Sequence, residues 1–376
     1  MTQIQKIHAA VVGAGHLGKH HSRILSGLPG VELVAVVDAN KETAAQVAGQ
    51  YGAQGLTDYR ELIGKVDAVV IATPTIYHAD VAVALLEQGV HCLVEKPMAT
   101  NFADARRMVE AASVAGATLA VGHTEQFNPA WQAVIGSAAQ PRYIEAVRQN
   151  GYTLRATDIG VVFDLMIHDL DLVLSLVKHP VERIEATGVK VFGGHEDVCN
   201  ARLTFTNGCV ANLTASRASH TPVRAMQIWS ANSFASVDFA TRSGHVLHPH
   251  GPLARGEVNI DSLSPAERDH MRKTLFEEQL RLEQLSAPAC DQLTAENEDF
   301  LRAIREGRRP RVDGRQACTA IAVAERILAK LQLFGWNGQT PHSAEVAPVV
   351  GAPLAGPHFL SSARRRLAWD DASDER

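Results

Sequence analysis

Two short motifs carry side chains of the types that transfer protons. Asp164 and His168 stand four residues apart in Asp-Leu-Met-Ile-His, and Lys96 stands in Glu-Lys-Pro, directly after an apolar run. A spacing of four puts two side chains on one face of an α-helix, where a carboxylate orients an imidazole and raises its basicity. The pair therefore suits a general base. Structural Asp–His pairs and solvated surface lysines are common, so these residues alone leave both interpretations open.

A third motif is typical of a phosphate-binding turn. The sequence Gly-Ala-Gly-His-Leu-Gly lies between an apolar run and a segment with helical character, and it fits G-x-G-x-x-G. The first glycine permits a tight turn, the second lets the backbone approach a pyrophosphate, and the third lets helix and strand pack closely. The helix N-terminus adds free N–H groups and a positive dipole. The residues that we expect at a dinucleotide are Gly13, Gly15, His16, Leu17 and Gly18.

The next acidic residue at the end of a strand indicates which dinucleotide binds. Asp38 ends the second apolar run, 20 residues after Gly18. A carboxylate at this place accepts hydrogen bonds from the ribose hydroxyls of adenosine and repels a 2′-phosphate. Ala39 and Asn40 offer no cation for that phosphate, so we predict NAD rather than NADP.

Asp169 and Asp171 add carboxylates beside His168, and these side chains are possible metal ligands. The cluster contains one histidine, and hydride transfer needs no metal ion. We therefore predict that the protein binds no metal.

The first 125 residues alternate between strands and helices. This alternation implies right-handed crossovers and a parallel, doubly wound sheet, so we assign residues 1–125 to a Rossmann domain. The predicted strands are 6–12, 31–37, 67–72, 91–94 and 118–121, and the helices are 17–26, 41–51, 77–88 and 102–115.

Residues 126–335 read as an α+β domain with an open, mostly antiparallel sheet, because short strands follow one another across turns such as Asn207-Gly208. The predicted strands are 142–148, 181–191, 198–205, 209–216, 225–230 and 235–239. The predicted helices are 158–176, 264–285, 294–306 and 315–333, and the last two can pack back on the first domain. The segment 340–376, rich in Pro, Ala and Gly, is expected to be disordered.

Composition excludes several classes of protein. The formal net charge of −5 over 376 residues gives no electrostatic footprint for nucleic acid or for an anionic membrane. No apolar run is long enough for a transmembrane helix, and the first ten residues do not resemble a signal peptide. The cysteines are widely spaced and form no C-x-x-C motif, which indicates free thiols in a reducing compartment. We expect a cytoplasmic protein without membrane insertion.

Taken together, the motifs resemble the glucose–fructose oxidoreductase / inositol dehydrogenase / rhizopine-catabolism (Gfo/Idh/MocA) family over roughly residues 6–335. The resemblance rests on the glycine motif with Asp38, on Ala-Thr-Pro followed by a histidine, on Glu-Lys-Pro and on D-x-x-x-H. It implies that Lys96 is the active-site lysine and that Asp164 and His168 are the paired carboxylate and imidazole. It also implies NAD-binding roles for Thr73, Pro74, His78, Glu95 and Lys96.

A narrower likeness appears in Val-Gly-His-Thr-Glu-Gln-Phe-Asn-Pro (121–129), Thr-Asp-Ile-Gly (157–160), 166–172 and Asn-Ala-Arg (200–202). These stretches look like the branch that oxidises UDP-N-acetylglucosamine at C3, supplying a transaminase for lipid A precursors. Gln126 departs from that branch, which has arginine at this position, and this puts a ligand contact there in doubt. The substrate-contact candidates are His123, Asn128, Arg148, Arg155 and Asp169, with Arg148, Arg155 and Arg217 as possible cations for a diphosphate.

Two alternatives share the cofactor but not the function. One is an NAD-dependent dehydrogenase of a free polyol or aldose such as inositol, since the catalytic residues act only on a secondary alcohol. The other is a non-catalytic NAD-binding regulator. In every case we expect a homodimer or homotetramer, formed through an open sheet face rich in Val, Leu and Phe.

Overall fold

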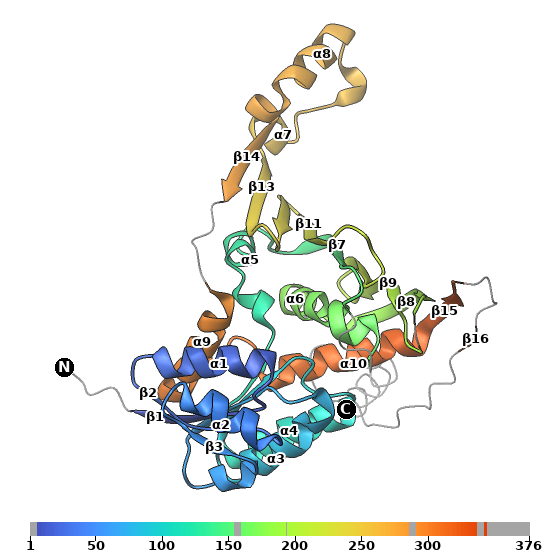
Figure 1. Ribbon diagram of the computed structural model, residues 1–376. Helices are drawn as coiled ribbons and strands as arrows, with labels where there is room; N and C mark the ends of the chain where they lie inside the picture. The colour runs from blue at the N-terminus through green and yellow to red at the C-terminus, as the bar shows by residue number, and fades with distance from the viewer. Residues whose placement is uncertain (1–5, 154–158, 193, 286–290, 337–341, 344–376) are drawn as a thin grey trace, which may run out of the picture.

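The computed structural model describes residues 6–153, 159–192, 194–285, 291–336 and 342–343, which form two domains and a projecting arm (Figure 1). The first domain contains six parallel strands in the order β3-β2-β1-β4-β5-β6. The parallel, doubly wound sheet is therefore confirmed, with the short β3 as an addition that we did not predict. The strands are β1 (Ile7–Val12), β2 (Val31–Val37), β3 (Gln54–Leu56), β4 (Ala68–Ile71), β5 (His91–Glu95) and β6 (Leu119–Gly122).

Helices cover both faces of this sheet, which explains why its strands are apolar on both sides. Val11 of β1 lies in one buried cluster and Val12, the next residue, in the other. The connecting elements are α1 (His16–Gly27), α2 (Lys41–Gly49), η1 (Tyr59–Leu62), η2 (Thr75–Tyr77), α3 (His78–Leu86) and α4 (Phe102–Ala115).

The second domain is built on a sheet of ten strands in the order β14-β13-β12-β11-β7-β10-β9-β8-β15-β16. Its pairs are antiparallel except for β7 with β10 and β8 with β15, which confirms the mostly antiparallel prediction. The strands are β7 (Pro141–Gln149), β8 (Val181–Lys190), β9 (Val198–Phe205), β10 (Val210–Ser216), β11 (Val223–Ser230), β12 (Phe234–Asp238), β13 (Ser243–Pro249), β14 (Leu280–Leu285), β15 (Leu331–Gly335) and β16 (His342–Ser343).

One face of this sheet is covered by helices and the other is polar over much of its area. The elements that contact the sheet on this face include α5 (Pro129–Val134), the π-helical turn η4 (Val162–Met166) and α6 (Ile167–Val177), and η3 (Thr124–Phe127) packs against α5 and α6. On the uncovered face, side chains such as Glu145, Asn200, Arg202 and Asn212 line a shallow depression. Alternation along each strand sends many of the apolar residues to the helix-covered side, so the uncovered face is more polar than the expected face rich in Val, Leu and Phe, although Val147 also lines the depression.

The helix that we predicted over 264–285 is a projecting arm instead. The arm comprises α7 (Gly251–Ala254), η5 (Ile260–Ser262), α8 (Pro265–Thr274), the π-helical turn η6 (Leu275–Gln279) and the hairpin of β13 with β14. Ser264 and Glu267 form a capping box at the start of α8. The helix therefore begins where the sequence indicates, but the last six residues form a strand because they pair with β13.

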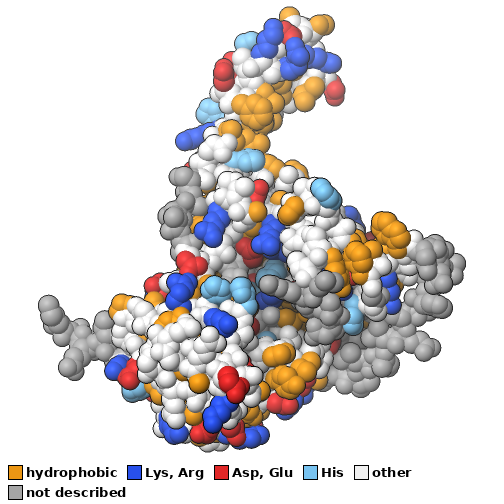
Figure 2. Space-filling model, viewed as in Figure 1, with side chains coloured by type: hydrophobic (Ala, Val, Ile, Leu, Met, Phe, Trp, Pro, Cys, Tyr) orange, Lys and Arg blue, Asp and Glu red, His pale blue; other side chains and the backbone are white. Residues whose placement is uncertain are grey.

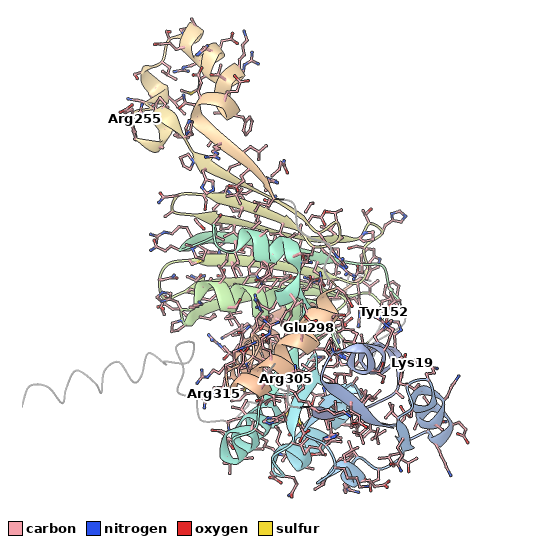
Figure 3. All side chains as sticks on the ribbon, turned by 90° about the vertical axis from the view of Figure 1, so that its left-hand side faces the viewer. Lys19, Tyr152, Arg255, Glu298, Arg305 and Arg315 are labelled. Carbon is pink, nitrogen blue, oxygen red and sulfur yellow. The ribbon has the colours of Figure 1, made fainter. Side chains whose placement is uncertain are left out.

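The last two helices lie against both domains. Phe300 and Leu301 of α9 (Gln292–Glu306) are buried in one cluster with Ile7 and Val11 of β1. The next helix, α10 (Gly314–Lys330), contacts α4 of the first domain and α6 and β8 of the second. It ends three residues before the predicted end, and the chain continues as β15 along the ten-stranded sheet. Figure 3 shows α9, marked by Glu298 and Arg305, between that sheet and the Rossmann domain.

Several expectations fall partly outside the described residues. The tail predicted to be disordered over 340–376 is described only at β16. Within the described residues no helix is both long and apolar enough to cross a membrane. Cys92, Cys199, Cys209 and Cys318 are free thiols, and Cys290 lies outside the described residues.

Candidate active site

The glycine motif forms a turn that has no room for side chains at two of its three glycines. Gly13 has φ +97°, and a Cβ there would lie 2.6 Å from the carbonyl carbon of Ala72. A Cβ on Gly18 would lie 1.7 Å from the carbonyl oxygen of Gly13, whereas a Cβ on Gly15 would meet nothing within 4 Å. The tight turn and the close helix packing are therefore real, and Gly15 leaves the space in front of α1 open.

Asp38 holds this turn in place. One carboxylate oxygen accepts a hydrogen bond from the Ala14 amide at 2.8 Å, and the other accepts from the Asn40 amide at 2.9 Å. Asp38 remains half-buried, while His16 and Leu17 are exposed at the start of α1. The free N–H groups of that helix terminus thus lie next to the Asp38 carboxylate, an arrangement that fits a dinucleotide.

The turns after β4 and β5 are joined by one imidazole. The ring nitrogens of His78 lie 2.8 Å from the carbonyl oxygen of Thr73 and 3.1 Å from that of Pro97. The hydroxyl oxygen of Thr73 is buried and has no hydrogen-bond partner in the described structure. A buried unpaired hydroxyl costs free energy unless a ligand or water satisfies it, so this atom also fits a cofactor bound at the carboxyl edge of the sheet.

Lys96 connects the two domains. Its Nζ atom donates to the backbone carbonyl oxygen of Asp164 at 2.9 Å and to its carboxylate at 3.4 Å. Its amide donates to the Glu95 carboxylate at 3.1 Å. The structure therefore brings the Glu-Lys-Pro and D-x-x-x-H motifs together. Figure 2 shows charged and histidine side chains gathered where the two halves of the molecule meet.

The expected contact between Asp164 and His168 is not formed. Asp164 belongs to the π-helical turn η4, where hydrogen bonds run from residue i to i+5, so the α-helical spacing assumed for the pair does not apply. Its carboxylate faces Lys96, and His168 Nδ1 is buried without a partner in the described part of the chain. Asp164 is therefore a partner of Lys96 rather than of His168.

The surroundings of His168 favour the neutral imidazole. Burial lowers the pKa of His168 well below its ordinary value, and the positive charges of Lys96 and Arg148 lower it further. The ring of His123 stands edge-on to it, with centroids 6.1 Å apart. Burial also lowers the pKa of His123, whose Nδ1 is another buried atom without a partner in the described structure. Two neutral imidazoles therefore lie beside the Lys96 ammonium.

Most of the other substrate-contact candidates are committed to the protein interior. Arg148 is buried and donates to Asp169 at 3.0 and 2.8 Å and to Glu125 at 2.8 Å. Asn128 is buried and donates to the Glu125 carboxylate and to a backbone carbonyl. Arg217 pairs with Asp197 at 2.7 Å. These groups are held by internal partners, and Arg155 lies outside the described residues.

The departure at Gln126 has a structural explanation. Its amide nitrogen donates to Asp171 at 2.7 Å and to Ser175 at 3.0 Å, and its oxygen accepts from the Trp131 indole at 3.3 Å. Asp171 also accepts from Gln316 of α10 at 2.7 Å. Gln126 is thus buried and joins η3 to α6.

One cation near the site was missed by the sequence analysis. Arg224 of β11 is exposed, and its charge is among those that lower the pKa of His168. It has no ion pair in the described structure, so its guanidinium is available to a ligand. Arg224 is far from every motif along the chain, so only the sheet pairing of β11 with β7 brings it near.

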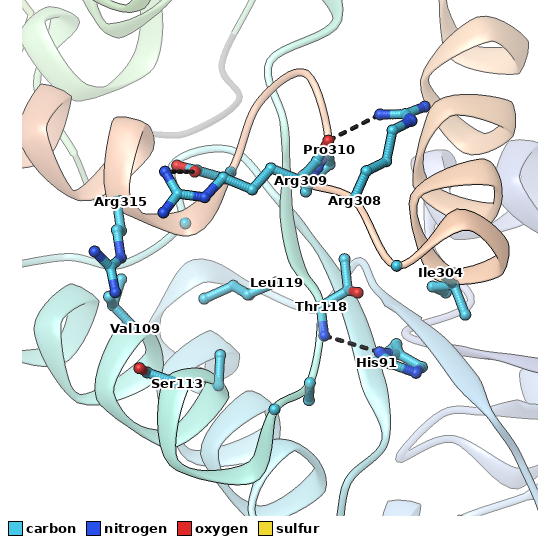
Figure 4. A pocket seen from close by; sticks show the side chains of 16 residues that line it. His91, Val109, Ser113, Thr118, Leu119, Ile304, Arg308, Arg309, Pro310 and Arg315 are labelled. Atoms are coloured by element: carbon cyan, nitrogen blue, oxygen red, sulfur yellow. Dashed lines mark hydrogen bonds and ion pairs between the residues drawn. The ribbon is translucent and has the colours of Figure 1, made fainter.

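A pocket of about 320 Å³ lies at the other end of the Rossmann sheet (Figure 4). It is lined by His91 at the start of β5, by Thr118 just before β6, and by Arg308, Arg309 and Arg315 around the α9–α10 loop. None of the motif residues lines it. Ligands of open α/β sheets bind at the carboxyl ends of the strands, so this pocket is separate from the candidate active site.

Comparisons with known proteins agree with this geometry. Residues 7–123 match the family model described as "Oxidoreductase family, NAD-binding Rossmann fold", and residues 102–231 match "GFO/IDH/MocA C-terminal domain". The UDP-N-acetylglucosamine 3-dehydrogenase of Acidithiobacillus ferrooxidans is 35% identical over 329 residues, which is 87% of this chain and 98% of that protein. The chain belongs to the Gfo/Idh/MocA oxidoreductase family.

Further relatives in the Gfo/Idh/MocA family are more distant. An inositol 2-dehydrogenase of Rhizobium meliloti is 30% identical over 227 residues, covering 56% of this chain and 69% of that protein. The solved structure of the Acidithiobacillus ferrooxidans enzyme superposes with a TM-score of 0.76, at 34% identity over 87% of this chain and 98% of that one. A levoglucosan dehydrogenase in complex with NADH shares the fold, with a TM-score of 0.72 at 19% identity over 87% and 97% of the two chains.

The Gfo/Idh/MocA assignment confirms the predicted cofactor and enzyme class. The protein is an NAD-dependent dehydrogenase acting on CH–OH groups. The alternative of a non-catalytic NAD-binding regulator is thereby set aside.

Proposed function

We propose that this enzyme oxidises a secondary ring hydroxyl of a sugar nucleotide, and that the substrate is UDP-N-acetylglucosamine, oxidised at C3. The observation that carries the proposal is the 35% identity to a UDP-N-acetylglucosamine 3-dehydrogenase over 98% of that protein's length. The inositol 2-dehydrogenase of Rhizobium meliloti is aligned over 69% of its length at 30% identity. The likeness therefore favours the sugar nucleotide over a free polyol.

Lys96 would bind the reacting hydroxyl. A lysine ammonium has three donors, and the carbonyl and carboxylate of Asp164 take two of them. The third is left for the substrate oxygen. A fixed positive charge at this oxygen stabilises the alkoxide that develops as the C–H bond breaks.

His168 would accept the hydroxyl proton. The half-buried ring stays neutral at neutral pH because its pKa is lowered, and a neutral imidazole nitrogen is a proton acceptor. His123, with its own unpaired buried Nδ1, lies where a proton leaving His168 could pass.

NAD, when bound, accepts the hydride from the substrate carbon. The glycine turn, Asp38 and the unpaired Thr73 hydroxyl are the groups that would hold it. The lone pairs of Asp38 that the turn does not use would accept hydrogen bonds from the ribose hydroxyls. The Thr73 hydroxyl would form a hydrogen bond at the end of the dinucleotide nearer to Lys96. The residues present thus fit the dinucleotide.

A diphosphate would need a cation that the protein has not already neutralised. Arg148 and Arg217 are paired internally, whereas Arg224 is exposed near His168. We therefore assign the diphosphate contact to Arg224. The 3-keto product would be an acceptor for a transaminase, as required for lipid A precursors with amide-linked chains.

The test is NADH formation, followed by absorbance, with the full-length protein and NAD. The substrates are UDP-N-acetylglucosamine, free N-acetylglucosamine and myo-inositol, each with and without a transaminase and amine donor that consume a 3-keto sugar. Of the three substrates, we expect only UDP-N-acetylglucosamine to yield NADH, and to yield more of it when the transaminase and amine donor are present. The KM for UDP-N-acetylglucosamine should be higher in Arg224→Gln. NADH from inositol but not from the UDP-sugar would reject the proposal.

A further inference from the structure

Behind Lys96 lies a buried cluster that the proposed reaction does not use. It consists of His21 of α1, Glu95 at the end of β5 and Glu296 of α9, which are 0%, 5% and 2% exposed. One ring nitrogen of His21 and one oxygen from each carboxyl group lie within 4.8 Å of one another. The cluster therefore joins the Rossmann sheet to the helix that returns from the second domain.

Hydrogen bonds link this cluster to the backbone of Lys96. His21 Nε2 lies 2.9 Å from one oxygen of Glu95, and the other oxygen of Glu95 accepts from the Lys96 amide at 3.1 Å. His21 Nδ1 lies 3.0 Å from the amide nitrogen of Asn297 and 3.2 Å from its amide oxygen, so the shorter contact makes Nδ1 the acceptor. With Nδ1 accepting from Asn297, Nε2 carries the proton and donates to Glu95. A Cβ on Gly122 would lie 2.9 Å from Glu95 Oε2, so the neighbouring strand also leaves room for this carboxylate.

Glu296 is the member of the cluster without a donor. Both of its carboxyl oxygens are buried, and neither has a hydrogen-bond partner in the described structure. The charges that act on it are Glu95 and Asp299, both negative, while His21 already serves Glu95. Glu125 of η3, which also packs against α9, is paired with Arg148. A carboxylate in this place would have no compensation, whereas a neutral carboxylic acid has a hydrogen to donate.

We propose that Glu296 is a positioning residue that keeps its proton, directs its O–H toward the Glu95 carboxylate, and so fixes the carboxylate that binds the Lys96 amide. The inference rests on the role given to Lys96 in the proposed function. Burial, together with the charges of Glu95 and Asp299, raises the pKa of Glu296 well above its ordinary value. In Glu95, burial acts in the opposite direction to the hydrogen bond and charge of His21, and its pKa is lowered overall. The two carboxyl groups thus divide into one acid and one carboxylate.

A metal ion is the competing explanation for a histidine and two carboxyl groups at this distance. Both nitrogens of His21 already have partners, Asn297 and Glu95, so the imidazole has no lone pair to offer while these bonds persist. The geometry therefore favours the proton.

The experiment compares three variants of the full-length protein with wild type. Glu296→Gln keeps a donor toward Glu95, Glu296→Ala removes it, and Glu298→Gln is the matched control on the exposed side of the same helix (Figure 3). Three readouts need no substrate. They are the infrared carbonyl band of a protonated carboxylic acid, the pH dependence of the melting temperature, and the rate at which an amine-reactive reagent modifies Lys96. With NAD and substrate present, kcat and KM are measured as well.

We expect the infrared band at neutral pH in wild type and in Glu298→Gln, and its loss in Glu296→Gln. A group with a raised pKa in the folded state loses stabilisation as pH rises above its unfolded value. The melting temperature of wild type should therefore fall relative to Glu296→Gln as the pH rises above the ordinary pKa of a glutamate. Glu296→Gln should keep kcat within about twofold, whereas Glu296→Ala should lower kcat about tenfold or more with KM for NAD little changed, and should alter Lys96 labelling.

Three results would overturn the inference. The first is an unchanged infrared band and melting profile in Glu296→Gln, because Glu296 would then be ionised. The second is wild-type Lys96 labelling in a folded Glu296→Ala protein. The third is one equivalent of metal in the purified protein that is lost from Glu296→Gln. Because these readouts need no substrate, a failure of the proposed sugar specificity would leave them informative.

Discussion

The Nζ atom of Lys96 lies 2.9 Å from the backbone carbonyl oxygen of Asp164, closer than the 3.4 Å that separates it from the carboxylate of the same residue. The lysine of one domain is therefore held chiefly by the main chain of the other. This contact depends on the position of the turn η4, and only secondarily on the side chain at position 164.

Removing the Lys96 charge should abolish most turnover. We expect Lys96→Met to lower kcat about 10²–10³-fold, since it removes a donor aimed at a developing alkoxide, with NAD affinity nearly unchanged. Because Lys96 and His168 act on one proton transfer, Lys96→Met with His168→Gln should cost far less than the product of the single effects. Steady-state kinetics and NAD titration measure both. Lys65→Met, at an exposed site, is the control, and additive losses would contradict the shared role.

The acid limb of activity should lie below the ordinary pKa of histidine. His168 must be neutral to accept a proton, and burial together with Lys96 and Arg148 lowers its pKa. We therefore expect kcat/KM to stay level as pH falls through about 6.5 and to decline only below it. His250→Gln, exposed on the arm, should keep this profile. A limb centred above about 6.5 would contradict the assignment of His168 as the base.

Asp164→Asn separates the contact with Lys96 from the contact with His168 that we first predicted. Because the carbonyl oxygen of Asp164 remains, this substitution should lower kcat less than about tenfold, in line with one weak hydrogen bond. It should leave the pH profile in place, since the carboxylate does not touch His168. A displaced acid limb in the pH dependence of kcat/KM would show that the carboxylate orients the imidazole after all.

Cofactor preference should depend on Asp38. Asp38→Ala removes the repulsion of a 2′-phosphate and frees the Ala14 amide, so we expect weaker NAD binding and a smaller preference over NADP. Fluorescence titration with both reduced cofactors measures the ratio. Glu42→Ala, which removes an exposed carboxylate nearby, is the control. The same NAD to NADP ratio in Asp38→Ala and wild type would rule out this role.

We also predict a homodimer or homotetramer, formed through aromatic residues on the uncovered face of the ten-stranded sheet. Tyr143, Trp229, Phe234 and His245 form a row of rings on the uncovered face, with neighbouring centroids 4.9–5.9 Å apart. Half-buried aromatic side chains are typical of interfaces. Light scattering at micromolar concentration should show an oligomer that Trp229→Glu weakens and Phe276→Glu, on the arm, does not. A monomeric wild-type protein would contradict this prediction.

The parts of the fold that local patterns determine could be predicted from the sequence. Apolar runs buried on both faces gave β1, β2, β4 and β5, and the helix over 102–115 begins at the Asn101 cap and ends at Gly116 as its sequence indicates. The segment Leu280–Leu285 has the charge pattern of a helix, and only its pairing with β13 makes it a strand. Tertiary pairing of this kind leaves little signal in the segment itself.

The site was predictable where a motif is continuous and not where distant residues meet. The place of Lys96 follows from the end of β5. The π-helical turn changes the geometry of Asp164 and His168 without any warning in their spacing. Arg148 could have been recognised as internal, because strand alternation puts it on the same face as Ile144 and Ala146. That Glu125 and Asp169 are its partners could not be predicted, since they come from two other segments of the chain.

The path of the chain has a consequence for synthesis on the ribosome. The Rossmann strands emerge first, yet Phe300 and Leu301 of α9 complete their core, and α10 and β15 complete the contacts of the second domain. Neither domain can therefore reach its final packing until almost the whole of residues 6–335 has left the exit tunnel. Until then, the strands that are made first keep an apolar face exposed to solvent. A chain truncated before α9 should therefore aggregate rather than form a folded Rossmann domain.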